Sequence, residues 1–206
     1  MVQITKLLSQ HPIVLSHSIN VFLLTSSVLE HLQLTEKEQR CLLVASLLHD
    51  IGKGYWPERW HTKPKHELLQ TDLVVMQAHP IQGVNDLKEA GISDPLVLQL
   101  VEQHHERSGG KGYPYQLETV HPLVLVLAAC DVYAACTEPR PYRDKSLTTD
   151  ETMREVEKFA PRPVLKALSQ KEVPSLGKKP LTKTDQLAML KQAIRSTTHH
   201  LNSNEF

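Results

Sequence analysis

The residues of this chain that could carry out chemistry are histidines and aspartates placed on apolar segments or at their ends. Asp131 is the clearest case, because it lies inside the run LVLVLAACDVYAAC. A buried carboxylate without a partner costs several kcal/mol, so a cationic group must meet it. The seven residues of this kind are His17, His49, Asp50, His79, His104, His105 and Asp131.

Each of these residues, taken alone, has an ordinary structural interpretation. Asp131 could pair with an arginine or lysine, His17 could be a hydrogen-bonded core histidine, and His79 could cap a helix. One metal cluster explains the whole set more economically. Imidazole and carboxylate ligands without a thiolate suit iron, manganese, zinc or nickel, not a structural zinc site. Five histidines and two aspartates, one of them bridging, are enough for two metal ions about 3.5–4 Å apart, an arrangement used in phosphoester hydrolysis.

The His49–Asp50 pair closes a predicted helix. Residues 35–38 read T-E-K-E, a capping box that begins the helix, and an apolar run continues it to Leu48. Gly52 suits a helix C-terminus, where the backbone turns left-handed. Adjacent residues on a helix point about 100° apart. His49 and Asp50 can therefore share one metal only near the helix end, where the second Asp50 oxygen could bridge to another ion.

Helical periodicity accounts for most of the remaining chain. Apolar residues recur at spacings of three and four, and no run of alternating β-branched residues indicates a strand. The other expected helices span residues 13–32, 65–78, 81–90, 94–104, 123–136, 148–159, 163–168 and 181–200. The predicted fold class is all-α, a bundle of roughly eight helices. We expect one domain over residues 1–170, followed by a polar linker and a C-terminal helix over 171–206 that packs on the domain or extends from it.

The composition narrows the class of protein. The formal net charge is +0, from 23 basic and 23 acidic residues, which argues against a nucleic acid polymer as partner. The three cysteines form no CxxC pair and are expected to be reduced. The N-terminus lacks the apolar core of a signal peptide, and the run 122–136 is too short to span a membrane. We expect a soluble, cytoplasmic protein without membrane contact.

Five motifs, taken in their order, carry a resemblance to a known family. They are H-S-x-x-V (17–21), H-D-I-G-K (49–53), H-P-x-x-G (79–83), H-H-E-R-x-x-G-x-G-Y-P (104–114) and D-V-Y-x-x-x-T-x-x-R-P-Y-R (131–143). Each motif alone is weak, but five in this order are specific. Over residues 13–168 the chain resembles the HD-GYP branch of the HD phosphohydrolase superfamily.

The resemblance implies a bacterial phosphodiesterase that opens cyclic di-GMP to pGpG and/or GMP with a water held between metal ions. It implies two divalent ions per chain, iron or manganese first and zinc or nickel as alternatives, bound by the seven residues named above. Asp50 would bridge the ions and act in catalysis with Lys53. Lys53, Arg140 and Arg143 would contact substrate phosphates. Tyr113 would bind substrate in a glycine-rich loop that is associated with diguanylate cyclase domains, although a simple loop-anchoring role is an equal alternative.

Three positions depart from the family pattern. Ile13 replaces a glutamate of the three-metal members, which favours two metals, whereas Gly109 and Ala134 stand where aspartates are usual. Because of the last two changes, a different phosphoester, such as cyclic GMP-AMP or a mononucleotide, stays an alternative substrate. A catalytically weak adaptor, docking through the Tyr113 loop or the C-terminal helix, is the alternative from another class.

Two further expectations concern the surroundings of the site. The residues between Lys53 and His79 include Trp56, Trp60 and His61, and we interpret them as a surface lid. Within it, we expect His61 or Lys65 near the mouth to be able to touch a nucleotide base or phosphate. Because only about a dozen residues precede the first predicted helix, we also expect a stand-alone enzyme without the fused sensory domains usual in the family.

Overall fold

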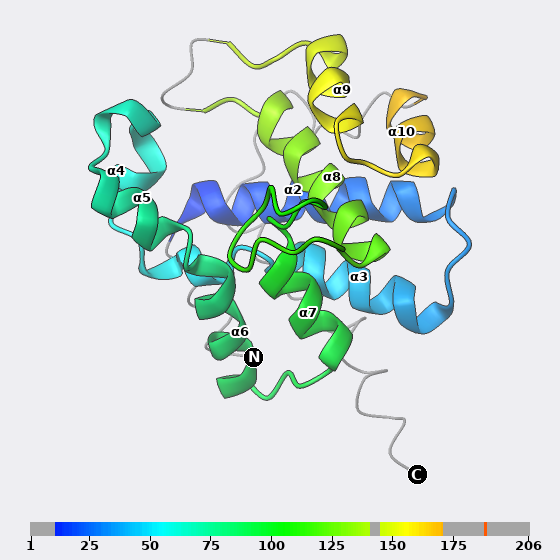
Figure 1. Ribbon diagram of the computed structural model, residues 1–206, viewed down its shortest axis with the longest axis horizontal. Coiled ribbons are helices and arrows are strands. Elements are labelled where there is room, and N and C mark those ends of the chain that lie inside the picture. Colours follow the sequence, from blue (N-terminus) through cyan, green and yellow to red (C-terminus); the bar gives the residue numbers. More distant parts are fainter. Residues whose placement is uncertain (1–10, 141–144, 171–187, 189–206) are drawn as a thin grey trace.

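The computed structural model describes residues 11–140, 145–170 and Ala188 (Figure 1). Within these residues the chain forms nine α-helices and two 3-10 helices and no strand, so the predicted all-α fold is confirmed. The predicted linker, the C-terminal helix and Arg143 lie outside the described residues. The elements are α2 (Pro12–Leu29), α3 (Glu36–Leu48), η1 (Ile51–Tyr55), α4 (Glu58–Thr62), η2 (Lys65–Glu67), α5 (Gln70–Met76), α6 (His79–Glu89), α7 (Pro95–Gln103), α8 (Pro122–Thr137), α9 (Thr149–Glu157) and α10 (Arg162–Ser169).

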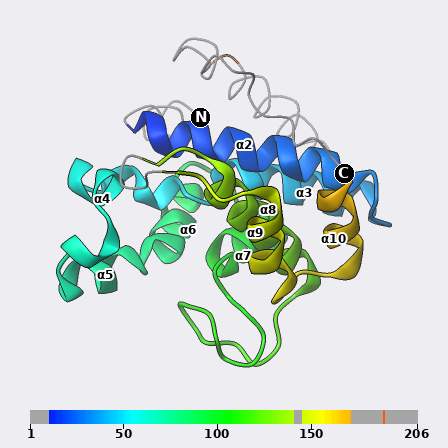
Figure 2. The same ribbon diagram turned by 90° about the horizontal axis from the view of Figure 1, so that it is seen from above.

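The core of the bundle is built around α8 and α2. Helix α8 is apolar on all sides, and it packs against α2, α3, α7 and α9. Helix α2 runs across the molecule with α3 beside it (Figures 1 and 2). Among the described residues, α2 is long and apolar enough to cross a membrane by length and composition alone, but half of that stretch is buried inside the protein. A core helix has the same composition.

The helices that approach the site begin and end where the sequence indicates. The Thr35–Glu38 capping box forms both of its hydrogen bonds at the start of α3. Asp94 caps α7 by accepting from the backbone N–H groups of Leu96 and Val97. Helix α6 begins at His79, two residues before the predicted start, so Pro80 lies in its first turn and does not separate His79 from the helix. The C-terminal ends of α3 and α7 and the start of α6 carry three of the predicted ligands, His49, His104 and His79.

The role predicted for Gly52 is wrong. Helix α3 ends at Leu48, and Gly52 lies within η1 without the left-handed backbone that Gly91, Gly109 and Gly110 adopt. A Cβ at Gly52 would lie 2.2 Å from the carbonyl oxygen of His79. Glycine is required here because η1 packs directly on the backbone of α6.

The segment between η1 and α6 also differs from the single helix predicted over residues 65–78. It forms η2 and α5, and it is preceded by α4, which the sequence did not indicate. Helix α5 buries none of its residues and stands at the edge of the bundle, next to α4 (Figures 1 and 2). Of the apolar residues in this segment, Leu68, Leu73 and Met76 line a cavity, whereas Leu69, Val74 and Val75 are exposed, so the apolar pattern does not mark a face buried in the core.

Candidate metal centre

All seven predicted ligands converge in one place, although they come from five segments of the chain. His17 and Asp131 project from the middles of α2 and α8, whereas His49, His79 and His104 stand at the ends of α3, α6 and α7. Their side-chain nitrogens and oxygens form three overlapping groups, each within 4.8 Å. The groups are His17, His49 and Asp50; His49, His104 and Asp131; and Asp50, His79, His104 and His105.

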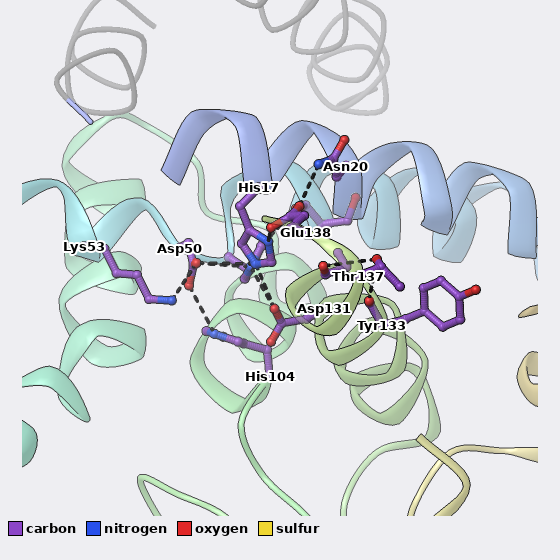
Figure 3. Close-up of polar contacts among 12 residues, drawn as sticks. His17, Asn20, Asp50, Lys53, His104, Asp131, Tyr133, Thr137 and Glu138 are labelled. Atoms are coloured by element: carbon purple, nitrogen blue, oxygen red, sulfur yellow. Dashed lines mark hydrogen bonds and ion pairs between the residues drawn. The ribbon is translucent and has the colours of Figure 1, made fainter. Parts of the chain in front are cut away.

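Asp50 lies at the centre of this arrangement and divides it. Its Oδ2 atom faces His17 and His49, with Nε2 atoms 3.8 and 3.5 Å away. Its Oδ1 atom faces His79 and His104, with Nε2 atoms 3.3 and 3.6 Å away. The two oxygens thus point toward two different groups of imidazoles, as a carboxylate that bridges two metal ions must do (Figure 3).

Backbone carbonyls orient three of the histidines. The Nδ1 atoms of His49, His79 and His104 lie 2.7–2.8 Å from carbonyl oxygens three residues earlier. A carbonyl can only accept, so each Nδ1 carries a proton, and an unprotonated Nε2 is then the atom that each ring can offer to the cluster. That tautomer is the one a metal ligand requires.

The donor set also fits divalent metal ions because several of its atoms lack other partners. His49 Nε2, Asp50 Oδ1 and His105 Nε2 are buried and have no hydrogen-bond partner among the described residues. Leaving buried polar atoms unpaired costs about 1–3 kcal/mol each. Cations bound at the centre of the cluster would give these unpaired nitrogen and oxygen atoms a partner and so remove this cost.

The charges around the cluster are strongly coupled. Burial opposes ionisation of Asp50 and Asp131, but both carboxyls keep a pKa well below the usual range. Lys53 and the neighbouring histidines lower the pKa of Asp50, and the neighbouring histidines alone, first His17, lower that of Asp131. Burial lowers the pKa of His49 and of His79 to about 4, so both rings are neutral at pH 7. For His17, burial is outweighed by Glu138 and Asp131, which raise its pKa to about 9.

Glu138 contacts this cluster and was not predicted from the sequence. Its Oε2 lies 2.9 Å from His17 Nδ1, and its Oε1 accepts a hydrogen bond from Asn20 (Figure 3). Glu138 stands at the C-terminal end of α8, two helical turns after Asp131, so both carboxylates reach the same histidine of α2. The spacing of seven residues between Asp131 and Glu138 could have indicated this from the sequence, because it places the two carboxylates on one helix face.

The predicted substrate-contacting residues stand around the cluster, as far as the structure describes them. Lys53 Nζ lies 2.6 Å from Asp50 Oδ2, and Arg140 Nη2 lies 3.0 Å from Glu138 Oε2. The Tyr113 ring stacks on His105, with ring centroids 4.5 Å apart. All three residues line one cavity of about 410 Å³, into which His17, Asp50, His79, His105 and Asp131 also open.

The glycine-rich loop is anchored by the same motif that supplies two histidines. Glu106 is fully buried, and its two oxygens accept hydrogen bonds from the backbone N–H groups of Tyr115 and Leu117. Gly109 is exposed with a φ of +77°, which explains glycine at that position. Ala134, the other departure, is buried in the core side of α8 and does not line the cavity.

Comparison with known proteins places the chain in a family. The HD domain model matches residues 14–136, and the chain belongs to the HD domain family. Cyclic di-GMP phosphodiesterase PA4108 of Pseudomonas aeruginosa is 36% identical over 129 residues, which are 62% of this chain and 31% of that protein. The 3'3'-cGAMP-specific phosphodiesterase 1 of Vibrio cholerae is 32% identical over 139 residues, 66% of this chain and 32% of that protein.

The chain therefore spans about a third of the length of these curated relatives. Among solved structures, Bd1817, an HDG"Y"P protein from Bdellovibrio bacteriovorus, aligns with a TM-score of 0.61 at 21% identity. The alignment covers 75% of this chain and 50% of that chain, and it supports the fold. The resemblance to HD-GYP phosphodiesterases, inferred from the five motifs, is confirmed.

Proposed function

We propose that this chain is a metal-dependent phosphodiesterase that hydrolyses a cyclic dinucleotide, cyclic di-GMP first, to pGpG and/or GMP. Residues 1–170 would form its catalytic domain. The observation that carries the proposal is the position of Asp50, whose two oxygens face two separate groups of histidines at the bottom of a cavity. A second aspartate and a row of cationic side chains complete a site suited to a phosphodiester.

The proposed ligand sets follow from these contacts. His17, His49 and Asp131 would hold one ion with Asp50 Oδ2, and His79, His104 and His105 would hold the other with Asp50 Oδ1. Iron or manganese is our first choice, with zinc or nickel as alternatives, because this donor set suits several first-row ions. When bound, such ions neutralise phosphate charge and lower the pKa of an attacking water toward neutrality.

The chain's own cations would position the substrate. Lys53 is held against Asp50, where its ammonium can also donate to a phosphate oxygen. Arg140 is fixed by Glu138 at the cavity wall and presents a guanidinium, which suits bidentate binding of phosphate. Tyr113 covers His105 and would exclude water on that side of the substrate. Arg143, outside the described residues, would add a further phosphate contact.

The relatives support the substrate class and favour one alternative. PA4108 is named a cyclic di-GMP phosphodiesterase, and the Vibrio cholerae relative is named as specific for 3'3'-cGAMP. Cyclic GMP-AMP is therefore the second candidate substrate. A contact with diguanylate cyclase domains through the Tyr113 loop and a cytoplasmic location remain parts of this proposal. The adaptor alternative does not account for seven converging ligands.

The experiment is a product assay on protein loaded with iron or manganese under reducing conditions. We expect cyclic di-GMP to yield pGpG or GMP, and Asp50→Ala to lose both metal and turnover. Arg140→Ala should raise KM while leaving the metal content unchanged. Metal-loaded protein that hydrolyses neither cyclic di-GMP nor cyclic GMP-AMP would overturn the assigned substrate class.

A further inference from the structure

The cavity above the metal centre has two walls of unlike chemistry. One wall carries five of the predicted ligands together with Lys53 and Arg140. The other wall comes from the segment 56–77, and it is mainly aromatic and apolar. The side chains of that segment that line the cavity are Trp56, Trp60, His61, Lys63, Leu68, Leu73, Met76 and Gln77.

The aromatic wall begins directly beside the metal centre. The Trp56 ring lies edge-on to His79, with centroids 5.5 Å apart, and Lys53 Nζ stands 5.3 Å from its centroid. Trp60 contacts Trp56 at 5.8 Å, and His61 contacts it at 5.4 Å. A group bound against this wall would therefore lie next to a phosphate held at the cluster.

His61 is the residue on this wall that needs a ligand. It is only 8% exposed, and its Nε2 has no hydrogen-bond partner among the described residues. The Nε1–H of Trp60 is likewise buried without a partner. Burial, with the nearby charges of His11 and Lys53, lowers the pKa of His61 to about 4, so the ring is neutral at pH 7. A packed core would leave neither nitrogen unpaired.

We propose that this wall is the nucleobase-binding part of the site and that it takes a purine. The inference rests on the proposed function for the phosphate that lies beside it. Aromatic side chains bind bases by stacking, which contributes about 1–3 kcal/mol per base. A purine presents ring nitrogens and an exocyclic group along its edge, and these can pair with a neutral imidazole and an indole N–H. Leu68, Leu73 and Met76 supply the apolar surface that a base face requires.

The composition of the chain supplies a direct probe. The sequence holds two tryptophans, Trp56 and Trp60, and both line this cavity, so intrinsic tryptophan fluorescence reports on this wall. GMP should quench it in a saturable way. Ribose 5-phosphate carries the same phosphate without a base, and it should leave the emission unchanged. Equal quenching by the two ligands, or none by GMP, would overturn the proposal.

Substitutions then locate the effect. Trp60→Leu leaves Trp56 as the reporter and should weaken GMP binding about 5- to 150-fold, as expected for loss of one base stack. His61→Leu keeps the volume and should weaken it as well, whereas Tyr115→Phe, an exposed aromatic outside the cavity, should not. Metal content checks that each variant is folded. Unchanged GMP affinity in folded Trp60→Leu and His61→Leu would contradict the assignment.

The same data separate this inference from the proposed function. If GMP quenches the fluorescence of a protein that does not hydrolyse cyclic di-GMP, the proposed function is contradicted and the proposed base site is supported. If the protein hydrolyses cyclic di-GMP but GMP and ribose 5-phosphate do not differ in quenching, the proposed function is supported and the proposed base site is contradicted.

Discussion

His17 and Glu138, which are 121 residues apart in the chain, form a hydrogen bond of 2.9 Å between Nδ1 and Oε2. Burial would raise the pKa of Glu138, but His17 and Arg140 keep it below its usual range, so the ionised carboxylate accepts a hydrogen bond from Nδ1–H of His17. The Nε2 atom of His17 then faces Asp131 and Asp50. Glu138 also fixes Arg140, and it therefore connects a proposed metal ligand with a proposed phosphate contact.

Replacing Glu138 should weaken metal binding. Loss of a carboxylate that orients a ligand histidine lowers metal affinity by about 10- to 100-fold, and we expect this of Glu138→Ala. Glu138→Gln keeps an oxygen that can accept from His17 and should restore part of the affinity. Competition against a chromogenic chelator measures both values. The matched control is Glu157→Gln on the exposed face of α9. Metal affinity in Glu138→Ala equal to that of the control would remove the positioning role.

Gly52→Ala should destabilise the fold strongly. The new Cβ would lie 2.2 Å from the carbonyl oxygen of His79 and 2.7 Å from the backbone nitrogen of Gly83, neither of which can move without shifting α6. Overpacking against backbone should cost about 3 kcal/mol or more in the free energy of unfolding. Gly91→Ala is the control, because nothing lies within 4 Å of its added Cβ and only its positive φ is strained, at about 1–2 kcal/mol. Urea unfolding compares them, and equal losses would be inconsistent with the close approach.

Removing the Glu106 carboxylate should release the glycine-rich loop. In Glu106→Ala the N–H groups of Tyr115 and Leu117 lose their acceptors, each worth about 1–3 kcal/mol when buried. Limited proteolysis should then cut within residues 108–117 faster than in the wild type. Glu106→Gln has one acceptor oxygen and should give an intermediate rate. A cleavage rate in Glu106→Ala equal to the wild type would show that the loop is held by other contacts.

Asp86 should make stability depend on pH. Burial raises its pKa above the usual range, although Tyr55 and Gln82 donate hydrogen bonds to Oδ1. Its Oδ2 has no hydrogen-bond partner in the part of the chain that the structure describes. The folded state therefore prefers the protonated form, and the free energy of unfolding falls as pH rises through the pKa of the folded carboxyl. Asp86→Asn should gain about 1 kcal/mol at pH 7 and nothing at a pH below the unfolded pKa. Thermal melts at the two pH values check this, and a loss of stability at pH 7 would contradict it.

The ligand set could be predicted from the sequence because its members break a strong rule. Charged and polar residues such as Asp131 are rare inside apolar helices, so their presence at helical spacing marks them without a structure. The capping box at Thr35 marks the start of α3, whose far end carries His49, and the proline after His79 marks the start of α6. These features depend on residues close together in the chain, so they can be recognised from the sequence.

The remaining features depend on tertiary contacts. Gly52 is compatible with both a left-handed turn and a close helix approach, and the sequence does not distinguish the two. Glu138 follows the end of an apolar helix, where a carboxylate is ordinary until α2 is placed beside it. Helix α4 has five residues, too few for a periodic signal, and in α5 Leu73 and Met76 line a cavity while Val74 and Val75 are exposed. From the sequence alone, apolar residues at helical spacing predict a face that is buried in the core.

The most direct test of the account is the number of metal ions bound per chain. Protein purified under reducing conditions and saturated with iron or manganese should contain about two ions, as the two groups of histidines around Asp50 require. Asp50→Ala should lose both ions, because each group loses its shared oxygen. A chain that binds no metal ion under any loading, or an Asp50→Ala variant that keeps both ions, would contradict the assignment of the site.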